Sequence, residues 1–453
     1  MITRKTEIQE LEKYFEGEEN HLILLYGREG SEKEDLLRTF AKNKPFFYYR
    51  CANASEKQQK ELLGKKIEAD YDVKLPEYTY EHFFDRIRSG NEKKLVLVFD
   101  EFQYLVKKDE EFLSHLIKLK KKQYYPGPVL IILATSSLVW VNKDVPLLPN
   151  QFEKQLDAKV MLPDDTFLDV VRHFPKYTTS ESVQIYGIIG GVPEYVRRWD
   201  GTLSVKENVC KHILSKDGFL FGAAERFIAS ELRELAVYQT ILASLASGNN
   251  KLNDLFLDTG FSRAKISVYM KNLMEFEVIE KVVSFETGGW ENTKKGVYRI
   301  SNTFVNFWFH FVYPHLSELY TIEPEKFYEK YIERELDAYL TRYFIDVCSE
   351  YLDLLNQIEK LPIKIAKMGT WIGKKGNIDI IAQNHARNSI VSLCNWSGTQ
   401  ISTKMVDELR ERMKLAHVSA DYLYLFSARG FDMDLSALAK KDDTIVLIDM
   451  NEL

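Results

Sequence analysis

The chain has 453 residues, of which 45% are hydrophobic and 28% are charged, and its formal net charge is −6. This length exceeds what a single hydrophobic core supports, so it predicts two to four domains of roughly 100–200 residues each. The acidic balance excludes a general attraction to nucleic acid or to an anionic membrane. Four widely spaced cysteines form no zinc or disulfide pattern, and no stretch is apolar for long enough to span a membrane. We therefore expect a folded protein of the reducing cytoplasm, without a membrane partner.

The first third of the chain alternates apolar runs with helical patterns. Amphipathic helices are expected at 3–16 and 34–42, and four apolar runs indicate strands, namely HLILLY (21–26), PFFYYR (45–50), KLVLVF (94–99) and PVLIILATSS (128–137). None of these runs alternates polar with apolar residues, as a strand with one wet face does. Strands of this kind are typical of a parallel sheet covered on both faces. The pattern predicts an α/β nucleotide-binding type of sheet.

The rest of the chain changes character twice. Residues 163–230 are helical, and residues 231–285 give three short helices followed by a strand pair that is broken at Gly288 and Gly289. Helix, helix, helix, hairpin is the order of a winged helix-turn-helix. A second α/β domain follows, with a long helix at 329–356, strands at 378–382 and 389–396, a helix near 403–415 and two last strands, YLYLFS and TIVLID. The expected domains are 1–162, 163–230, 231–322 and 323–453.

The stretch GREGSEKE, residues 27–34, follows the first strand as a phosphate-binding loop follows its strand. In a loop of the form GxxxxGK[ST], bare amides approach the phosphates, a lysine reaches their oxygens and a hydroxyl holds Mg²⁺. Gly27 and Lys33 match this template. Glu32 replaces the second glycine and Glu34 the hydroxyl, which crowds the loop and repels phosphate. The loop alone therefore predicts weakened binding of a nucleotide.

Polar residues follow the third and fourth strands. Asp100 and Glu101 end an apolar run, where a carboxylate can hold Mg²⁺ and another can polarise the attacking water. Ser136 and Ser137 end the next run and are candidates for a sensor of the terminal phosphate. Each feature also has a simple interpretation as a strand end. Their order along the chain favours the nucleotide site.

Further along the chain, GGVPEY places Gly191 and Pro193 where a proline ring is able to pack against adenine. With DEFQYL, TSS, GGVPEYV and VNFWFHFVYP, the sequence resembles the archaeal-type AAA ATPases of the signal-transduction class, over nearly the whole chain. The resemblance implies an ATPase domain, a helical lid, a winged helix and a domain similar to restriction endonucleases. It also implies the following roles: Lys33 for the phosphate, Asp100 for Mg²⁺, Glu101 as the base, Ser136 or Ser137 as the sensor and Pro193 at adenine.

The segment from Trp371 to Trp396 resembles the core of the restriction-endonuclease fold. Such a nuclease needs an acid on one strand and an acid-x-lysine on the next, because two carboxylates hold the metal. Asp379 is the one acid that remains, since Leu393 and Asn395 stand where the second acid and the lysine belong. A single acid does not hold a catalytic metal. We therefore expect the fold without nuclease activity, with Asp379 as a vestigial acid.

Basic residues of the expected winged helix, Arg263, Lys265 and Lys271, are placed to meet DNA phosphates, although winged helices also bind proteins. The partner is therefore left open between DNA and a protein. The favoured function is an ATP-binding protein with impaired or absent hydrolysis that acts as a regulatory or scaffold component, with ATP and Mg²⁺ as cofactors. The alternative is an active ATPase switch that controls DNA or protein binding through the winged helix and the C-terminal domain.

Overall fold

A computed structural model describes residues 4–87, 93–106, 111–121, 128–285, 296–396 and 398–452 of the chain. The chain divides into two compact units, Met1–Asp164 and Asp165–Leu453. We describe each unit by itself. Across the described ranges, no helix has the length and apolar character that crossing a membrane requires.

A five-stranded sheet forms the centre of the first unit, in the order β2-β3-β4-β1-β5. Every neighbouring pair in this sheet is parallel, which confirms the α/β prediction. The fifth strand was not predicted from the sequence, because its four residues include exposed side chains on an edge. The strands are β1 (His21–Tyr26), β2 (Phe46–Arg50), β3 (Leu95–Asp100), β4 (Val129–Thr135) and β5 (Ala158–Met161).

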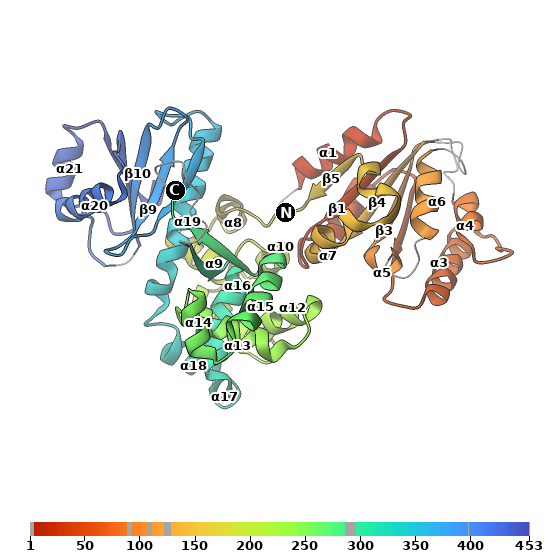
Figure 1. Cartoon of the computed structure of the whole chain (residues 1–453), viewed down its shortest axis with the longest axis horizontal. Coiled ribbons are helices and arrows are strands. Elements are labelled where there is room, and N and C mark those ends of the chain that lie inside the picture. Colours follow the sequence, from red (N-terminus) through yellow and green to blue (C-terminus); the bar gives the residue numbers. More distant parts are fainter. Residues whose placement is uncertain are drawn as a thin grey trace. The chain divides into compact units, whose positions relative to one another are not determined.

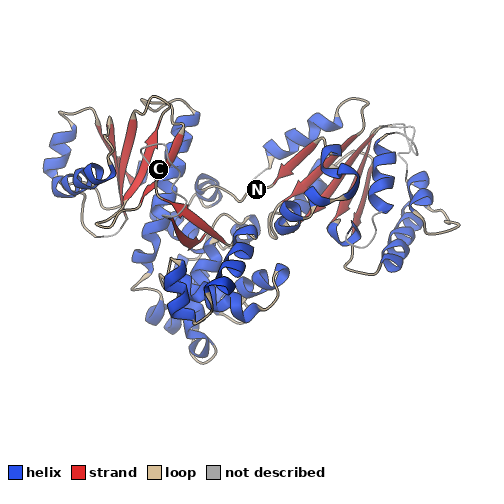
Figure 2. Ribbon diagram, in the orientation of Figure 1, coloured by secondary structure: helices blue, strands red, loops and turns tan. Residues whose placement is uncertain are grey.

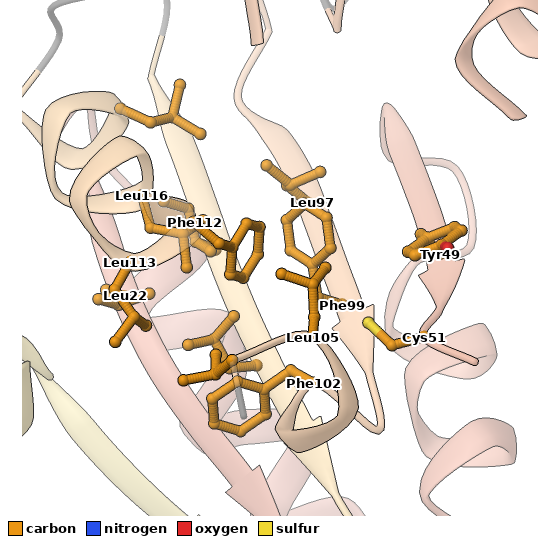
Figure 3. Packing of buried hydrophobic residues seen from close by; sticks show 14 of the residues in the cluster. Leu22, Tyr49, Cys51, Leu97, Phe99, Phe102, Leu105, Phe112, Leu113 and Leu116 are labelled. Carbon is orange, nitrogen blue, oxygen red and sulfur yellow. The ribbon is translucent and has the colours of Figure 1, made fainter. Parts of the chain in front are cut away.

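Helices cover both faces of this sheet (Figure 1). Successive residues of a strand point to opposite faces, so Val96 and Val98 pack under α1 and α2 while Leu97 and Phe99 pack on the other side. Figure 3 shows the cluster on the side of Leu97 and Phe99, in which the Phe99 and Phe112 rings pack edge to face with their centroids 5.0 Å apart. The helices of this unit are α1 (Lys5–Phe15), α2 (Lys33–Phe40), α3 (Glu56–Tyr71), α4 (Tyr80–Arg86), α5 (Gln103–Val106), α6 (Glu111–Lys120) and α7 (Leu138–Lys143).

The second unit begins with helices, α8 (Phe167–His173), α9 (Thr179–Ile189), α10 (Pro193–Arg198), α11 (Val205–Asn208) and α12 (Ala223–Glu231). The expected order of helix, helix, helix and antiparallel strand pair follows, as α13 (Leu235–Ala246), α14 (Leu252–Thr259), α15 (Arg263–Glu275), β6 (Ile279–Val283) and β7 (Gly296–Ile300). Gly288 and Gly289 lie outside the described residues. The name winged helix stays a prediction.

A mixed five-stranded sheet, in the order β12-β11-β10-β9-β8, closes the second unit (Figure 2). Strands β10 to β12 are parallel, and β8 and β9 are antiparallel to their neighbours. The single helix expected at 329–356 is in fact two helices, which residues 332–335 separate. The elements are α16 (Thr303–Phe307), α17 (Leu316–Leu319), α18 (Pro324–Tyr331), α19 (Leu336–Gln357), β8 (Lys367–Trp371), β9 (Ile378–Gln383), β10 (Ser389–Asn395), α20 (Thr403–Ala416), β11 (Tyr422–Ser427), α21 (Met433–Ala439) and β12 (Ile445–Asp449).

Candidate functional site

The carboxyl ends of β1, β3 and β4 meet at one edge of the first sheet. The register pairs Tyr26 with Thr135 and Asp100 with Ala134, so the loop after β1 and the polar residues after β3 and β4 share this edge. Strand β1 has β4 on one side and β5 on the other, and the connections from β1 to β2 and from β4 to β5 run to opposite sides. Ligands of open parallel sheets bind at the carboxyl edge where the strand order reverses. The candidate site therefore lies at the end of β1.

The loop after β1 keeps an unusual backbone. Glu32 directly precedes α2 with φ 59° and ψ 38°, a left-handed conformation that glycine adopts without strain. Gly30 also has a positive φ, of 83°. Gly27 is tightly packed, because a Cβ there would lie 2.8 Å from Ser31 Oγ and 2.9 Å from Leu162 Cβ. The residue types at 27 and 30 thus suit the bend, while Glu32 occupies a glycine conformation.

Lys33 begins α2 and is buried, and its Nζ donates to the Gly27 carbonyl over 3.0 Å. Burial lowers the pKa of Lys33 below its usual value, and the nearby carboxylates of Glu101 and Asp100 oppose this shift. The lysine therefore faces both acids across the edge of the sheet. The Glu32 side chain makes no capping hydrogen bond to the first-turn amides of α2.

Glu34 and Ser31, in and next to the loop, differ in their exposure to solvent. Glu34, which replaces the template hydroxyl, is exposed and accepts hydrogen bonds from Arg38 one helical turn later, the shortest at 2.7 Å. Ser31 is fully buried, and its Oγ has no hydrogen-bond partner among the described residues. An unsatisfied buried hydroxyl costs free energy, and a polar ligand at the loop would relieve that cost.

Asp100 and Glu101 are both buried at the end of β3. Asp100 accepts a hydrogen bond from the Tyr48 hydroxyl at 2.8 Å and one from the Glu101 amide at 3.0 Å. Burial raises the pKa of Asp100, and the hydrogen bond from Tyr48 opposes this shift. Glu101 has a left-handed backbone, with φ 52°, and it accepts from Gln103 Nε2 at 2.7 Å. Both carboxylates are thus held in place by neighbours.

The two serine candidates have different partners. The Ser136 hydroxyl donates to Glu101, and the Ser136 amide lies 3.3 Å from the same carboxylate. The Ser137 hydroxyl instead accepts from the Trp140 amide and caps α7. Ser136 therefore orients the acid of β3, and Ser137 starts a helix.

Sequence reasoning missed three residues at this edge. Tyr48 and Arg50 come from β2, which pairs with β3 so that Arg50 lies opposite Asp100, and Gln103 is the first residue of α5. Arg50 is exposed and contributes positive charge near Lys33 and Asp100. The only sequence signal for Tyr48 and Arg50 is their place at the end of a strand. Their role depends on which strand lies next to β3.

Gly191 and Pro193 belong to the second unit. Pro193 is buried in the first turn of α10. The Gly191 carbonyl accepts from the Asp165 amide at 2.7 Å, and a Cβ on Gly191 would lie 1.8 Å from the Asp165 carbonyl oxygen. Close backbone packing within the second unit is therefore the visible reason for glycine at position 191.

Asp379 lies on β9, and its carboxylate accepts from the Cys394 amide at 2.8 Å. Burial raises the pKa of Asp379 to about 6, and the bond from Cys394 opposes this shift. Leu393 is buried in the apolar core beside α20, and Asn395 donates to the Thr399 carbonyl. No group of three or more His, Cys, Asp or Glu side chains in the described ranges is arranged to hold a metal ion.

Comparisons with known proteins find a separate family match in each half of the chain, and the first match extends past the boundary between the two units. Residues 1–198 match a family described as an ATPase domain predominantly from Archaea, and residues 308–408 match a family of archaeal and bacterial proteins of unknown function. An uncharacterized protein of Methanocaldococcus jannaschii is 26% identical over 383 residues, which is 84% of each chain.

Solved structures give weaker similarity. A Walker-type ATPase of Pyrococcus abyssi is 17% identical, with a TM-score of 0.48, over 68% of this chain and 96% of that one. The ORC2 protein of Aeropyrum pernix, solved with ADPNP and ADP, is 12% identical, with a TM-score of 0.45, over 68% of this chain and 92% of that one.

The parallel sheet resembles that of P-loop NTPases, and the match to the archaeal ATPase-domain family covers the whole of the first unit. The region that matches the ATPase-domain family is followed by a helical region and by a C-terminal domain with a mixed sheet, part of which matches the second family.

Proposed function

We propose that the first unit binds ATP with Mg²⁺ at the carboxyl edge of its sheet and turns it over slowly or not at all, so that the protein acts as a regulatory or scaffold component. The observation that carries this proposal is the conformation of Glu32. A residue with a side chain adopts the left-handed geometry of a phosphate-loop glycine directly before the lysine. This backbone geometry supports a loop of the phosphate-binding form, in which Glu32 takes the place of the second glycine.

The donors at the loop fit a triphosphate. Lys33 Nζ has the Gly27 carbonyl as its near partner, the amides at the start of α2 have no side-chain cap, and the buried Ser31 hydroxyl is unsatisfied. Backbone amides at a helix start and a lysine are the groups that hold phosphate oxygens. In this proposal Gly27 permits the bend, and Lys33 neutralises the terminal phosphates.

The side chains at the loop supply only part of the ligand set that Mg²⁺ has in such sites. Asp100 supplies one carboxylate for Mg²⁺, which in nucleotide sites combines one or two carboxylates with phosphate oxygens and water. The hydroxyl that completes the template is absent, and Glu34 is bound to Arg38 instead. Glu101, which Ser136 and Gln103 orient, remains the candidate base. An intact base beside an incomplete cation site supports binding with slow chemistry.

Charge also weakens the site. Glu29, Asp100 and Glu101 all act electrostatically on Lys33, against one further cation, Arg50. A carboxylate a few ångströms from a phosphate costs about 1–4 kcal/mol, which is about one to three decades of affinity. We therefore expect weak binding of ATP.

Titration calorimetry with ATP and Mg²⁺ tests this proposal on the full-length protein, in parallel with a phosphate-release assay. We expect weak binding that Lys33→Ala abolishes, with no turnover above background. In Glu32→Gly/Glu34→Thr, affinity should rise by about one to three decades. Lys57→Ala, at an exposed position on α3, is the matched control for the lost lysine. Turnover at an ordinary rate that depends on Lys33 would instead establish the alternative, an active ATPase switch.

A second candidate function, DNA binding through α15, rests on the exposed face of that helix. This face presents Arg263, Ala264, Ser267, Val268 and Lys271, and Lys271 lies 3.9 Å from Glu275 at the end of the same helix. Arg263 is held in place by the Phe256 ring, 4.1 Å below its guanidinium carbon. Small side chains between two cations suit a helix that lies in a major groove.

Salt-dependent binding of duplex DNA by the full-length protein tests the second candidate. Reversal of Arg263 and Lys271 to glutamate should abolish the binding and its salt dependence, because each neutralised phosphate contributes to the slope. Arg172→Glu, at an exposed position on α8, is the control. Equal loss in both variants would mean that the binding is general charge attraction and not a property of α15.

A further inference from the structure

The last residues of the first unit run alongside the phosphate loop. The Leu162 amide donates to the Tyr26 carbonyl at 2.7 Å, directly before the loop begins. The Leu162 side chain lies so close to Gly27 that a Cβ on this glycine would be 2.9 Å from it. The chain therefore leaves the ATPase domain in contact with the loop that is proposed to hold the phosphates.

Arg4 joins the loop to this exit. Its Nη1 donates to the Pro163 carbonyl at 2.8 Å, and its Nη2 lies 3.3 Å from the Ser31 carbonyl. Glu7, one turn later on α1, lies 3.4 Å from the same guanidinium. A guanidinium is planar and its donors have fixed directions, so it holds its two carbonyl partners in one geometry. Arg4 therefore couples the position of the Ser31 peptide to that of Pro163.

A second arginine comes from the loop itself. Arg28 Nη1 lies 3.4 Å from Asp164 Oδ2, and the two side chains are only 19% and 30% exposed. Partial burial reduces solvent screening of this ion pair, which makes it stronger than a fully exposed one. The phosphate loop is thus tied directly to Asp164, the last residue of the first unit.

The next residue is fixed in the second unit. The Asp165 amide donates to the Gly191 carbonyl at 2.7 Å, and Gly191 packs so closely that a Cβ would lie 1.8 Å from the Asp165 carbonyl oxygen. Asp164 and Asp165 are therefore anchored in different units although they are adjacent in sequence. The peptide bond between Asp164 and Asp165 is therefore where the chain passes from one unit to the other.

We propose that Arg4, Arg28 and Asp164 form a latch that reports occupancy of the phosphate loop to the junction between the two units. This proposal rests on the proposed nucleotide binding. A triphosphate repels the Asp164 carboxylate and attracts the Arg28 guanidinium, because phosphate oxygens form strong charge-assisted bonds with arginine. Binding at the loop therefore opens the Arg28–Asp164 pair and loosens residues 162–164.

Hydrogen exchange of the full-length protein, followed by mass spectrometry on peptides that cover residues 160–168, tests the latch. Saturating ATP with Mg²⁺ should accelerate exchange at the junction about tenfold in the wild-type protein. In Asp164→Asn the junction should exchange rapidly without nucleotide, and ATP should add nothing further. Arg172→Gln, which removes an exposed arginine just beyond the junction, should respond to ATP as the wild type does.

Calorimetry on the same samples separates the two proposals. ATP affinity should rise by up to about tenfold in Asp164→Asn, because this variant lacks the carboxylate that ATP repels and the ion pair that ATP has to open. Bound ATP without a change at residues 162–164, or a full ATP response in Asp164→Asn, overturns the latch and leaves the proposed function intact. If neither the wild type nor Glu32→Gly binds ATP, both the proposed function and the latch are rejected.

Discussion

The carboxyl edge of the first sheet and the Asp379 region of the second sheet both depart from the residue patterns that the sequence resembles, but in different ways. At the first edge the backbone keeps its special form, and the replaced side chains at 32 and 34 are at least partly solvent-accessible. Around Asp379 the replacement is part of the packing, because Leu393 is buried in the core beside α20. A side chain on an accessible loop can be replaced without repacking its neighbours. Replacement of a side chain in a packed core disturbs the packing around it. Introduction of the residues that these patterns require should therefore succeed at the first edge and fail at the second.

The largest effect is expected from Leu393→Glu, which restores the acid of the nuclease pattern. The new carboxylate would replace a core side chain on the strand next to Asp379, within the apolar cluster that packs against α20. An unpaired buried charge costs about 3–5 kcal/mol. Urea unfolding should show that loss, and no Mg²⁺-dependent DNA cleavage should appear. Asn395→Lys, at a less buried position of the same strand, is the control and should cost far less. A stable Leu393→Glu protein that cleaves DNA would remove the contrast between the two edges.

Asp379 should make the free energy of unfolding of the second unit dependent on pH. Its pKa in the folded protein is about 6, against an ordinary value of 3.8, so the folded state holds the proton more tightly than the unfolded state. The protonated Asp379 carboxyl therefore favours the folded state. Its contribution to the free energy of unfolding is fully present below about pH 4 and is lost as the pH rises through about 6. Asp379→Asn keeps an acceptor for the Cys394 amide and should raise the free energy of unfolding by about 2–3 kcal/mol near pH 8.

The same substitution should have little effect near pH 4, where the wild-type carboxyl is already protonated in the folded state. Urea unfolding at several pH values measures the difference. Asp434→Asn, at an exposed position on α21, serves as the control. An equal gain at all pH values would mean that packing, and not the buried charge, is responsible.

The tight packing of the first edge is tested by Gly27→Ala. The added Cβ would approach Ser31 Oγ and Leu162 Cβ to less than 3 Å. Overpacking of this kind costs about 1–3 kcal/mol, and here it should also weaken ATP binding by distorting the loop. Gly201→Ala, where the nearest atom belongs to the Phe174 ring at 3.2 Å, should cost less. Thermal unfolding measures the loss of stability, and calorimetry measures the loss of ATP affinity. If Gly27→Ala changes neither quantity, the loop is not closely packed at Gly27.

Continuous apolar runs were sufficient to predict β1, β3 and β4, because a strand buried on both faces leaves that pattern in the sequence. They did not reveal β5 or β8, which are short and lie at sheet edges. The break at 332–335 within the expected long helix has no proline or glycine to mark it. Local patterns carry no information on where an edge strand or such a break occurs.

The residues of the candidate site also divide into those that the sequence predicts and those that it does not. Asp100, Glu101 and Ser136 were predictable, because each directly follows an apolar strand. Tyr48 was not, since its contact with Asp100 exists only through the pairing of β2 with β3. The ties from Arg4 to Pro163 and from Arg28 to Asp164 join residues more than a hundred positions apart. Such contacts are properties of the folded chain and leave no local signal.

The smallest effect, and the sharpest test of the first edge, comes from Glu32. Left-handed geometry costs a residue with a Cβ about 1 kcal/mol relative to glycine, so Glu32→Gly should stabilise the first unit by about that amount. Glu32→Ala removes the same carboxylate but keeps the Cβ, and it should give no such gain. ATP affinity then separates two causes of weak binding. If charge repulsion dominates, both variants bind more tightly to a similar degree; if the bulk of the side chain dominates, Glu32→Gly exceeds Glu32→Ala. A loss of stability in Glu32→Gly would mean that the glutamate side chain holds the loop in place, and the loop would then be a stable surface turn instead of a preserved phosphate site.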